Sequence, residues 1–181
     1  MTGLRKSLDP KLLEQAVREI GDLAEGENVT VALIGGYALQ FFGSTRLTGD
    51  IDLIADAPIQ ELEPSKGLSF GGQRTVAPNG VPADIVVRDD DFRELYEDAL
   101  DHVTDAGAPI PIVQPEYIAA MKLVAGRRRD FDDLEFLIRQ GVIDVPKTKQ
   151  IIRTHLGPYA AREFQAFVDE VQWRASRDTD G

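Results

Sequence analysis

"GSTRLTGDIDLIADAP", residues 43–58, is the stretch of sequence that decides the fold. Its centre, "DIDLIA" (50–55), alternates polar and apolar residues, and this alternation predicts a β-strand. Successive side chains on a strand point to opposite faces, so we expect Asp50 and Asp52 to share one face. Like charges this close repel each other and destabilise the fold. A divalent cation would relieve the repulsion, because carboxylate oxygens are its natural hard ligands.

The surroundings of this acidic pair strengthen the prediction of a site. Upstream, "VTVALI" (29–34) predicts a short strand that Gly35-Gly36 ends, and "YALQFFG" follows as a short helix. Exposed N–H groups at a helix start favour phosphate, and glycine allows close approach to the backbone. Downstream, "ADIVV" (83–87) predicts a second strand that carries a third acid, Asp84. An exposed strand face, an ordinary tight turn and an acid at a strand edge remain the alternatives for the three features taken singly.

The rest of the chain predicts two parts. Residues 8–27 predict an amphipathic helix with Asp9 as N-cap and Pro10 as first residue. "APIPIVQ" (108–114) predicts a short edge strand, because it contains two prolines. From Pro115 onward, four successive segments have helical periodicity. We therefore expect an α/β core over residues 1–113 and a helical C-terminal region over 114–181, packed on the core.

Composition narrows the classes of function. The chain has 181 residues, a net charge of −11 and no cysteine, which excludes disulfides and thiolate metal sites. We expect a cytoplasmic protein without a signal peptide or membrane helix, since no long apolar run occurs. The acidity argues against broad DNA binding. "GRRRD" (126–130) is a local basic cluster, either a nucleic-acid contact or a solvated helix end.

These motifs together resemble the nucleotidyltransferase superfamily, whose fold is shared with DNA polymerase β. The resemblance consists of "IGG", then Asp50-Ile-Asp52, then Asp84, and of the lysine-containing stretch "PEYIAAMKLVAGRRRDFDDLEFLI" (115–138). It covers roughly residues 29–140 and is greatest for a small bacterial branch related to AbiEii-type toxins and other stand-alone transferases. The resemblance implies an α+β fold: a polymerase β-like mixed sheet flanked by helices, followed by an all-helical C-terminal part.

The resemblance also implies roles for particular residues. Asp50 and Asp52 would be metal ligands, and Asp84 would be the third ligand and would assist deprotonation of the nucleophile. Nucleotide-binding residues would be Gly35 and Gly36, which cradle phosphates, together with Arg46 and Lys122 near the triphosphate. Contacts to the acceptor, or accessory roles, would fall to Arg127, Arg128, Asp130 and Asp133. One departure is Gly36, because the family often has a serine there and its hydroxyl contact to phosphate is lost.

The implied activity is transfer of a nucleoside monophosphate from an NTP, such as ATP, to a hydroxyl, with release of pyrophosphate. Mg²⁺ or Mn²⁺ would be the cofactor. The acceptor would be an RNA 3′ end such as that of tRNA, a protein side chain or a small molecule. One alternative is a catalytically silent module of a toxin–antitoxin-like pair, with a cognate antitoxin-like partner. Another is a metal-dependent phosphodiester hydrolase, against which the Gly-Gly turn argues, since hydrolysis has less need of a triphosphate cradle.

Overall fold

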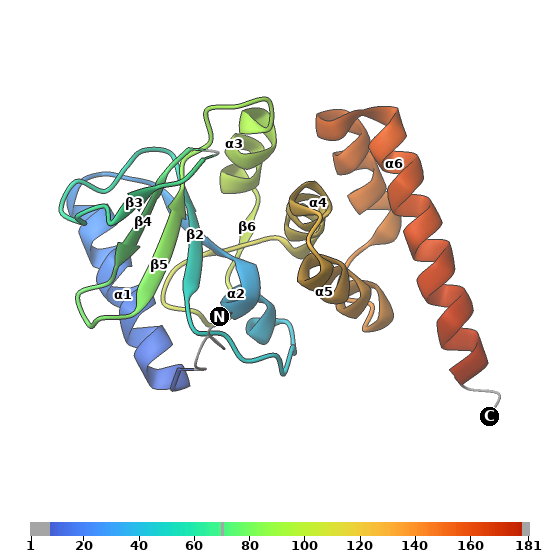
Figure 1. Ribbon diagram of the computed structural model, residues 1–181, viewed down its shortest axis with the longest axis horizontal. Coiled ribbons are helices and arrows are strands. Elements are labelled where there is room, and N and C mark those ends of the chain that lie inside the picture. Colours follow the sequence, from blue (N-terminus) through green and yellow to red (C-terminus); the bar gives the residue numbers. More distant parts are fainter. Residues whose placement is uncertain (1–7, 70, 179–181) are drawn as a thin grey trace. The chain divides into compact units, whose positions relative to one another are not determined.

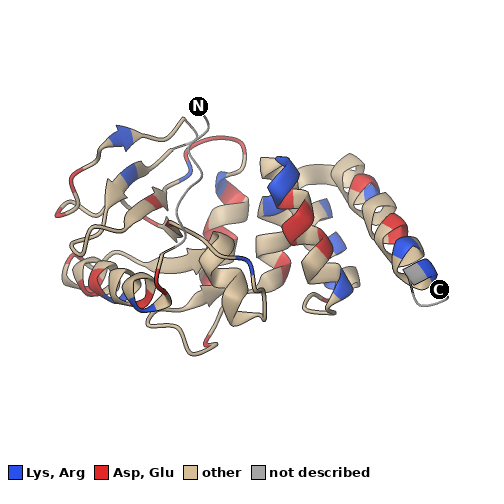
Figure 2. Ribbon diagram, turned by 60° about the horizontal axis from the view of Figure 1, so that its bottom comes forward, with Lys and Arg blue, Asp and Glu red and all other residues tan. Residues whose placement is uncertain are grey.

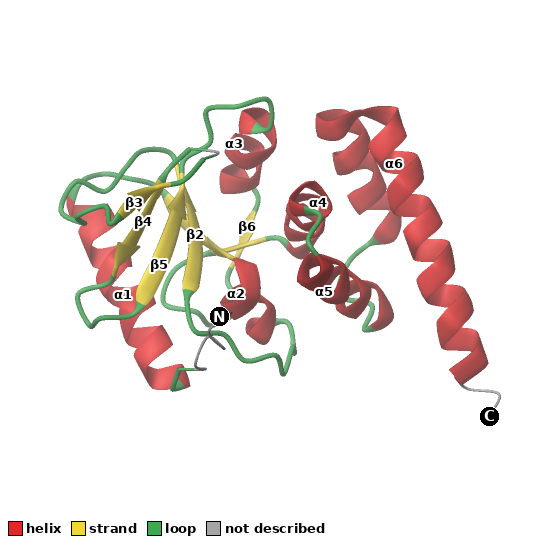
Figure 3. Ribbon diagram, in the orientation of Figure 1, coloured by secondary structure: helices red, strands yellow, loops and turns green. Residues whose placement is uncertain are grey.

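The computed structural model describes residues 8–69 and 71–178. The chain divides into two compact units, Met1–Val113 and Gln114–Gly181. The first unit contains the strands, and the described part of the second is helical (Figure 3). The acidic residues are spread over both units (Figure 2).

The strands of the first unit form one mixed sheet. They are β1 (Val31–Ile34), β2 (Ile51–Ala55), β3 (Lys66–Gly67), β4 (Gln73–Val76), β5 (Pro82–Val86), β6 (Val103–Thr104) and β7 (Ile112–Val113). The order across the sheet is β3-β4-β5-β2-β1-β7-β6. β2 runs antiparallel to β1 and parallel to β5. The two acid-bearing strands predicted from the sequence are therefore neighbours in the centre of the sheet.

Helices cover the sheet on both sides. Figure 1 shows α1 (Pro10–Gly26) on one side, and α2 (Gly35–Phe41) and α3 (Arg93–Asp101) on the other. The predicted cap of α1 is confirmed, because the Asp9 carboxylate accepts a hydrogen bond from the Lys11 backbone N–H at 2.9 Å. The buried face of α1 consists of Leu13, Ala16, Val17, Ile20 and Ala24. Burial of this apolar stripe gives the helix most of its stability.

Three predictions from the sequence were wrong, namely the start of β2, the start of α2 and the position of β7 at the edge of the sheet. β2 begins at Ile51, so Asp50 lies in a bend just before the strand. α2 begins at Gly35 itself, because the chain passes from β1 into the helix without an intervening loop. β7 is not an edge strand, since it lies between β1 and β6. Its prolines do not prevent pairing because they precede the paired residues, and Pro111 contributes a carbonyl that accepts the Leu33 N–H at 2.9 Å.

The second unit contains α4 (Pro115–Ala125), α5 (Arg128–Arg139) and α6 (Val145–Asp178). Gly126 ends α4 in a left-handed conformation with φ 62°. α6 is interrupted at Gly157, whose φ of 89° and ψ of 173° are not helical, and Pro158 follows. The break corresponds to the two separate helices expected on either side of this point. Within the described residues, no helix combines the length and the apolar character needed to span a membrane.

Candidate functional site

Gly35 and Asp52 meet where β1 turns into α2. Ile34, the last residue of β1, pairs in register with Asp52 on β2. Gly35 has φ +72°, and a Cβ atom there would overlap the Asp52 carboxylate. The position therefore needs glycine for two reasons, namely the left-handed backbone and the space that the carboxylate occupies. The sequence motif "GG" is thus directly linked to one of the predicted acids.

Gly36 and Arg46 form the second contact at this turn. A Cβ atom on Gly36 would lie 2.6 Å from Nη2 of Arg46, so the guanidinium packs against the helix start. The backbone of Arg46 is fixed by Gln40, whose Nε2 donates to the Arg46 carbonyl at 2.9 Å. The fold thus brings two predicted phosphate-binding glycines, a predicted triphosphate contact and a predicted metal ligand to one turn.

Asp50 is held in the bend before β2. The hydroxyl of Thr48 donates to Asp50 Oδ1 at 3.0 Å. Thr48 is itself buried, with 7% of its surface exposed, so its hydroxyl is a fixed donor. Asp50 and Asp52 are both half-buried. The hydrogen bond from Thr48 thus fixes the orientation of the Asp50 carboxylate.

Asp84 lies on β5 directly beside Asp52. The parallel register pairs Asp52 with Asp84, and Ile51 with Ala83. Registered neighbours on adjacent strands point to the same face of a sheet, so the two carboxylates are side by side. Buried Ala83 and Ile85 flank Asp84 on its own strand. The structure thus brings together acids from two adjacent strands.

Arg74 on β4 is a site residue that the sequence analysis missed. Its Nε donates to Asp84 Oδ1 at 2.7 Å, and its Nη2 donates to Asp84 Oδ2 at 2.6 Å. β4 and β5 pair antiparallel, with Arg74 directly opposite Asp84. A signal was present, because a hairpin centred on Asn79 in "PNG" places these two residues opposite each other. The consequence is that both oxygens of Asp84 already accept hydrogen bonds.

Arg74 on β4 interacts electrostatically with Asp84 on β5 and with Asp52 on β2. The hydrogen bonds to Asp84 and the charge of Asp84 raise the pKa of Arg74, and the charge of Asp52 raises it further. A permanent cation therefore offsets part of the repulsion between Asp52 and Asp84. From the sequence, we expected a divalent cation to relieve the repulsion between Asp50 and Asp52.

The donor set at the turn suits a hard divalent cation, because it consists of carboxylate oxygens. Across residues 8–69 and 71–178, however, no three His, Asp or Glu side chains are grouped so that together they could hold a metal ion. At this site, both oxygens of Asp84 already accept hydrogen bonds from Arg74. Asp50 and Asp52 could hold a cation here, and Asp84 could become a third ligand only if Arg74 released it.

The remaining predicted residues cluster within the second unit. Nζ of Lys122 lies 3.1 Å from Asp130 Oδ1 and 2.6 Å from Asp133 Oδ2. The three side chains are 10%, 0% and 4% exposed, so this is a buried ion cluster. Arg127 completes it, with Nε 2.7 Å from Asp130 Oδ2. Arg128 is the first residue of α5 and is exposed.

The ionisation of Asp130 reflects this cluster. Burial by itself would raise the pKa of Asp130, but hydrogen bonds and charge from Arg127 and Lys122 outweigh burial and lower the pKa. Asp130 also accepts the backbone N–H of Arg127 at 3.2 Å, at the start of α5. The "RRRD" run is therefore partly a helix-capping arrangement and not only a basic surface.

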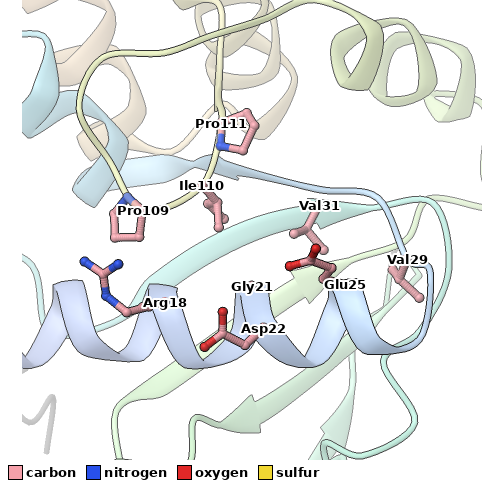
Figure 4. A pocket seen from close by; sticks show the side chains of 9 residues that line it. All are labelled: Arg18, Gly21, Asp22, Glu25, Val29, Val31, Pro109, Ile110 and Pro111. Carbon is pink, nitrogen blue, oxygen red and sulfur yellow. The ribbon is translucent and has the colours of Figure 1, made fainter.

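A pocket of about 380 Å³ opens elsewhere in the first unit, between α1 and residues 109–111 (Figure 4). Arg18, Asp22 and Glu25 line it from α1, while Val31 and Ile110 supply apolar surface. Of the residues that line it in the described part of the chain, none is a predicted site residue. The pocket is thus distinct from the carboxylate site.

Comparison with solved structures identifies the fold. An antigenic nucleotidyltransferase-like protein from Paracoccidioides brasiliensis is 16% identical with a TM-score of 0.51, and the match covers 91% of this chain and 95% of that chain. JHP933 from Helicobacter pylori is also 16% identical with a TM-score of 0.51, over 96% of this chain and 97% of that chain. The fold is that of nucleotidyltransferase-like proteins. The predicted α+β class is thereby confirmed, and so is the resemblance at the level of fold.

Comparisons of the amino-acid sequence identify no family and no relative. No protein-family model matches the chain, and no curated protein matches it. At 16% identity, the two structural matches establish the fold and leave the activity to be argued from the site. The likeness to the AbiEii-type branch stays a prediction.

We predict that Gly35→Ala destabilises the first unit by about 2–5 kcal/mol, because both backbone strain and overlap with Asp52 oppose it. Gly80→Ala is the matched control, since Gly80 has φ +90° but nothing within 4 Å of an added Cβ. The control should lose only about 1–2 kcal/mol, the cost of the left-handed backbone. Urea denaturation of both variants measures the difference, and equal losses would mean that Asp52 does not constrain this position.

We predict that Lys122→Met costs about 3–5 kcal/mol of stability, because it removes the cation that the buried carboxylates of Asp130 and Asp133 share. Lys147→Met is the control within the same unit, as Lys147 is 3.6 Å from Glu116 but 47% exposed. The exposed pair should contribute about 0–1 kcal/mol. Thermal and urea unfolding measure the loss of stability in the two variants. If Lys122→Met loses no more stability than Lys147→Met, the buried cluster is not structural.

The lowered pKa of Asp130 predicts a specific acid sensitivity. The unfolded state binds a proton on this residue near the ordinary value of 3.8, while the folded state stays ionised at that pH. The contribution to stability is therefore complete above pH 3.8 and is lost as the pH falls below it through the folded pKa. Asp130→Asn should flatten the fall in stability below about pH 5 relative to wild type. Identical slopes for the two proteins would contradict the assignment.

Proposed function

We propose that the protein is a metal-dependent nucleotidyltransferase that moves a nucleoside monophosphate from an NTP to a hydroxyl acceptor and releases pyrophosphate. The observation that carries the proposal is the turn where the Asp52 carboxylate packs against Gly35, beside Asp84 on the neighbouring strand. The nucleotidyltransferase-like fold supports the same activity. Acids beside a strand-to-helix turn suit binding of a triphosphate with its counter-cation.

Binding of the nucleotide is assigned to the turn. Gly35 and Gly36 are proposed to contact phosphate through their backbone, and Arg46 adds positive charge against Gly36. Lys122 is proposed as a further triphosphate contact. In that role it gives up one of its two aspartate partners, Asp130 or Asp133, since both pair with Nζ here.

Asp50 and Asp52 would hold the divalent cation, Mg²⁺ or Mn²⁺. When bound, such a cation supplies positive charge to the phosphate oxygens during transfer. The chain itself orients Asp50 through the Thr48 hydroxyl and fixes Asp52 by its register with Ile34. Asp84 would accept the proton of the acceptor hydroxyl once Arg74 releases one of its oxygens.

The acceptor is proposed to be a hydroxyl of an RNA 3′ end, with a protein side chain or a small molecule as other classes. The exposed run of Arg127 and Arg128 beside α5 supports contact with a polyanion, although Arg127 is already paired with Asp130. Action as the toxin of a two-component pair, with an antitoxin-like partner, remains a proposal that rests on the resemblance of the motifs.

One observation favours a second candidate, a catalytically silent binding module. Arg74 pairs with both oxygens of Asp84. This arrangement is more typical of a structural ion pair than of a general base with an oxygen available to accept a proton. A silent module of this kind would bind NTP without transferring it. Transfer activity distinguishes the two candidates directly.

We predict that Asp52→Asn abolishes transfer of label from α-labelled NTP, in the presence of Mg²⁺ or Mn²⁺, to total RNA or lysate protein. Removal of one charge-bearing ligand should reduce the rate by at least about 100-fold, as losses of single electrostatic groups do. Asp91→Asn is the control, because Asp91 is an exposed acid on the same unit. Unchanged melting temperatures of both variants would show that the loss is chemical. Undiminished transfer by Asp52→Asn would refute the assignment, and NTP binding without any transfer by wild type would favour the silent module.

A further inference from the structure

The pairing of Arg74 with Asp84 has a consequence for metal binding at the carboxylates. Arginine offers a planar fork of N–H donors that matches a carboxylate, and here both arms of the fork are used on Asp84. The side chain of Asp84 is 16% exposed and that of Arg74 is 41% exposed, so the pair is partly shielded from water. Shielding makes the charge more effective than in a surface ion pair.

The backbone of Arg74 is fixed on both sides. β5 pairs with it on one edge, and residues before β3 on the other, where Ser65 N and Ser65 Oγ donate to the Arg74 carbonyl at 2.8 and 3.0 Å. The next residue, Thr75, is only 1% exposed and anchors the strand. The guanidinium is therefore presented to Asp84 by the sheet itself and not by a loop.

We propose that Arg74 is a built-in cation of the carboxylate site, so that the site binds one divalent cation, through Asp50 and Asp52, and not a second one between Asp52 and Asp84. This inference rests on the proposed metal-dependent function and refines it. A metal ion bound to the oxygens of Asp84 would lie next to a guanidinium whose nitrogens are 2.6 and 2.7 Å from those oxygens. Two cations at that spacing repel each other, and the arginine cannot lose its proton to escape.

The charges around Asp84 agree with this arrangement. Arg74 compensates the Asp84 carboxylate without any metal, through two hydrogen bonds to its oxygens. A second divalent cation at Asp84 would place its charge directly beside this guanidinium before the triphosphate arrives. Arg74 is a positioning residue in this scheme, because it acts through Asp84.

The test is a titration of the full-length protein with Mn²⁺, in which electron paramagnetic resonance reads the free ion. Wild type should bind one Mn²⁺ per chain, and Asp52→Asn should lose it. Arg74→Gln should bind a second Mn²⁺, and the affinity of the first should rise roughly tenfold because a nearby positive charge is gone. Arg74→Lys keeps the charge and should keep a single site. Arg93→Gln is the matched control, since Arg93 pairs with Glu97 on the surface of α3.

The double variant Arg74→Gln/Asp84→Asn locates the gained site, because it should return to one Mn²⁺ per chain. Melting temperatures of all variants show that each is folded. If Arg74→Gln titrates like wild type while Asp52→Asn loses its ion, the inference is overturned and the proposed metal site stands. If wild type binds no Mn²⁺ that Asp52→Asn removes, the metal site of the proposed function fails, and the inference fails with it.

Discussion

The approach of the Asp52 carboxylate to the backbone of Gly35 is the constraint on which the rest of the site depends. β1 and β2 are antiparallel neighbours, so the last residue of β1 is paired with Asp52 and the turn into α2 lies directly against the acid. A residue with a side chain at this turn would collide with the carboxylate. Because α2 begins at that glycine, the helix, the acid and the open backbone are positioned by the same contact.

Pairing of shielded carboxylates with cations is the second structural feature that shapes the molecule. The chain is strongly acidic, with a net charge of −11, yet its shielded carboxylates are paired with cations. Arg74 pairs with Asp84 in the sheet, and Lys122 pairs with Asp130 and Asp133 in the helical unit. Buried ion clusters contribute little net stability compared with apolar packing, but breaking one is costly. Such clusters therefore hold particular side chains in particular places, which is what a site requires.

The two clusters differ in their surroundings. In the sheet, Asp50 and Asp52 are half-buried carboxylates at the turn from β1 into α2, where we propose that a cation and a triphosphate bind. In the helical unit, Lys122 is almost fully covered by its two aspartates, so its first role is to stabilise the packing of α4 against α5. The nucleotidyltransferase-like fold accommodates both roles, and the proposed chemistry concentrates at the turn.

The sequence by itself determined the elements and most members of the site. Periodicity and capping residues placed α1, β1, β2 and β5, and the "IGG" and "DID" motifs selected Gly35, Gly36, Asp50 and Asp52. These signals are local, since they depend on side-chain alternation and helix ends within a few residues. Only the tertiary structure decided which strands are neighbours, and hence that Asp84 stands beside Asp52. It alone showed Arg74 on Asp84 and Lys122 between two aspartates, because strand register and helix packing bring together residues that are distant in sequence or carry no local motif.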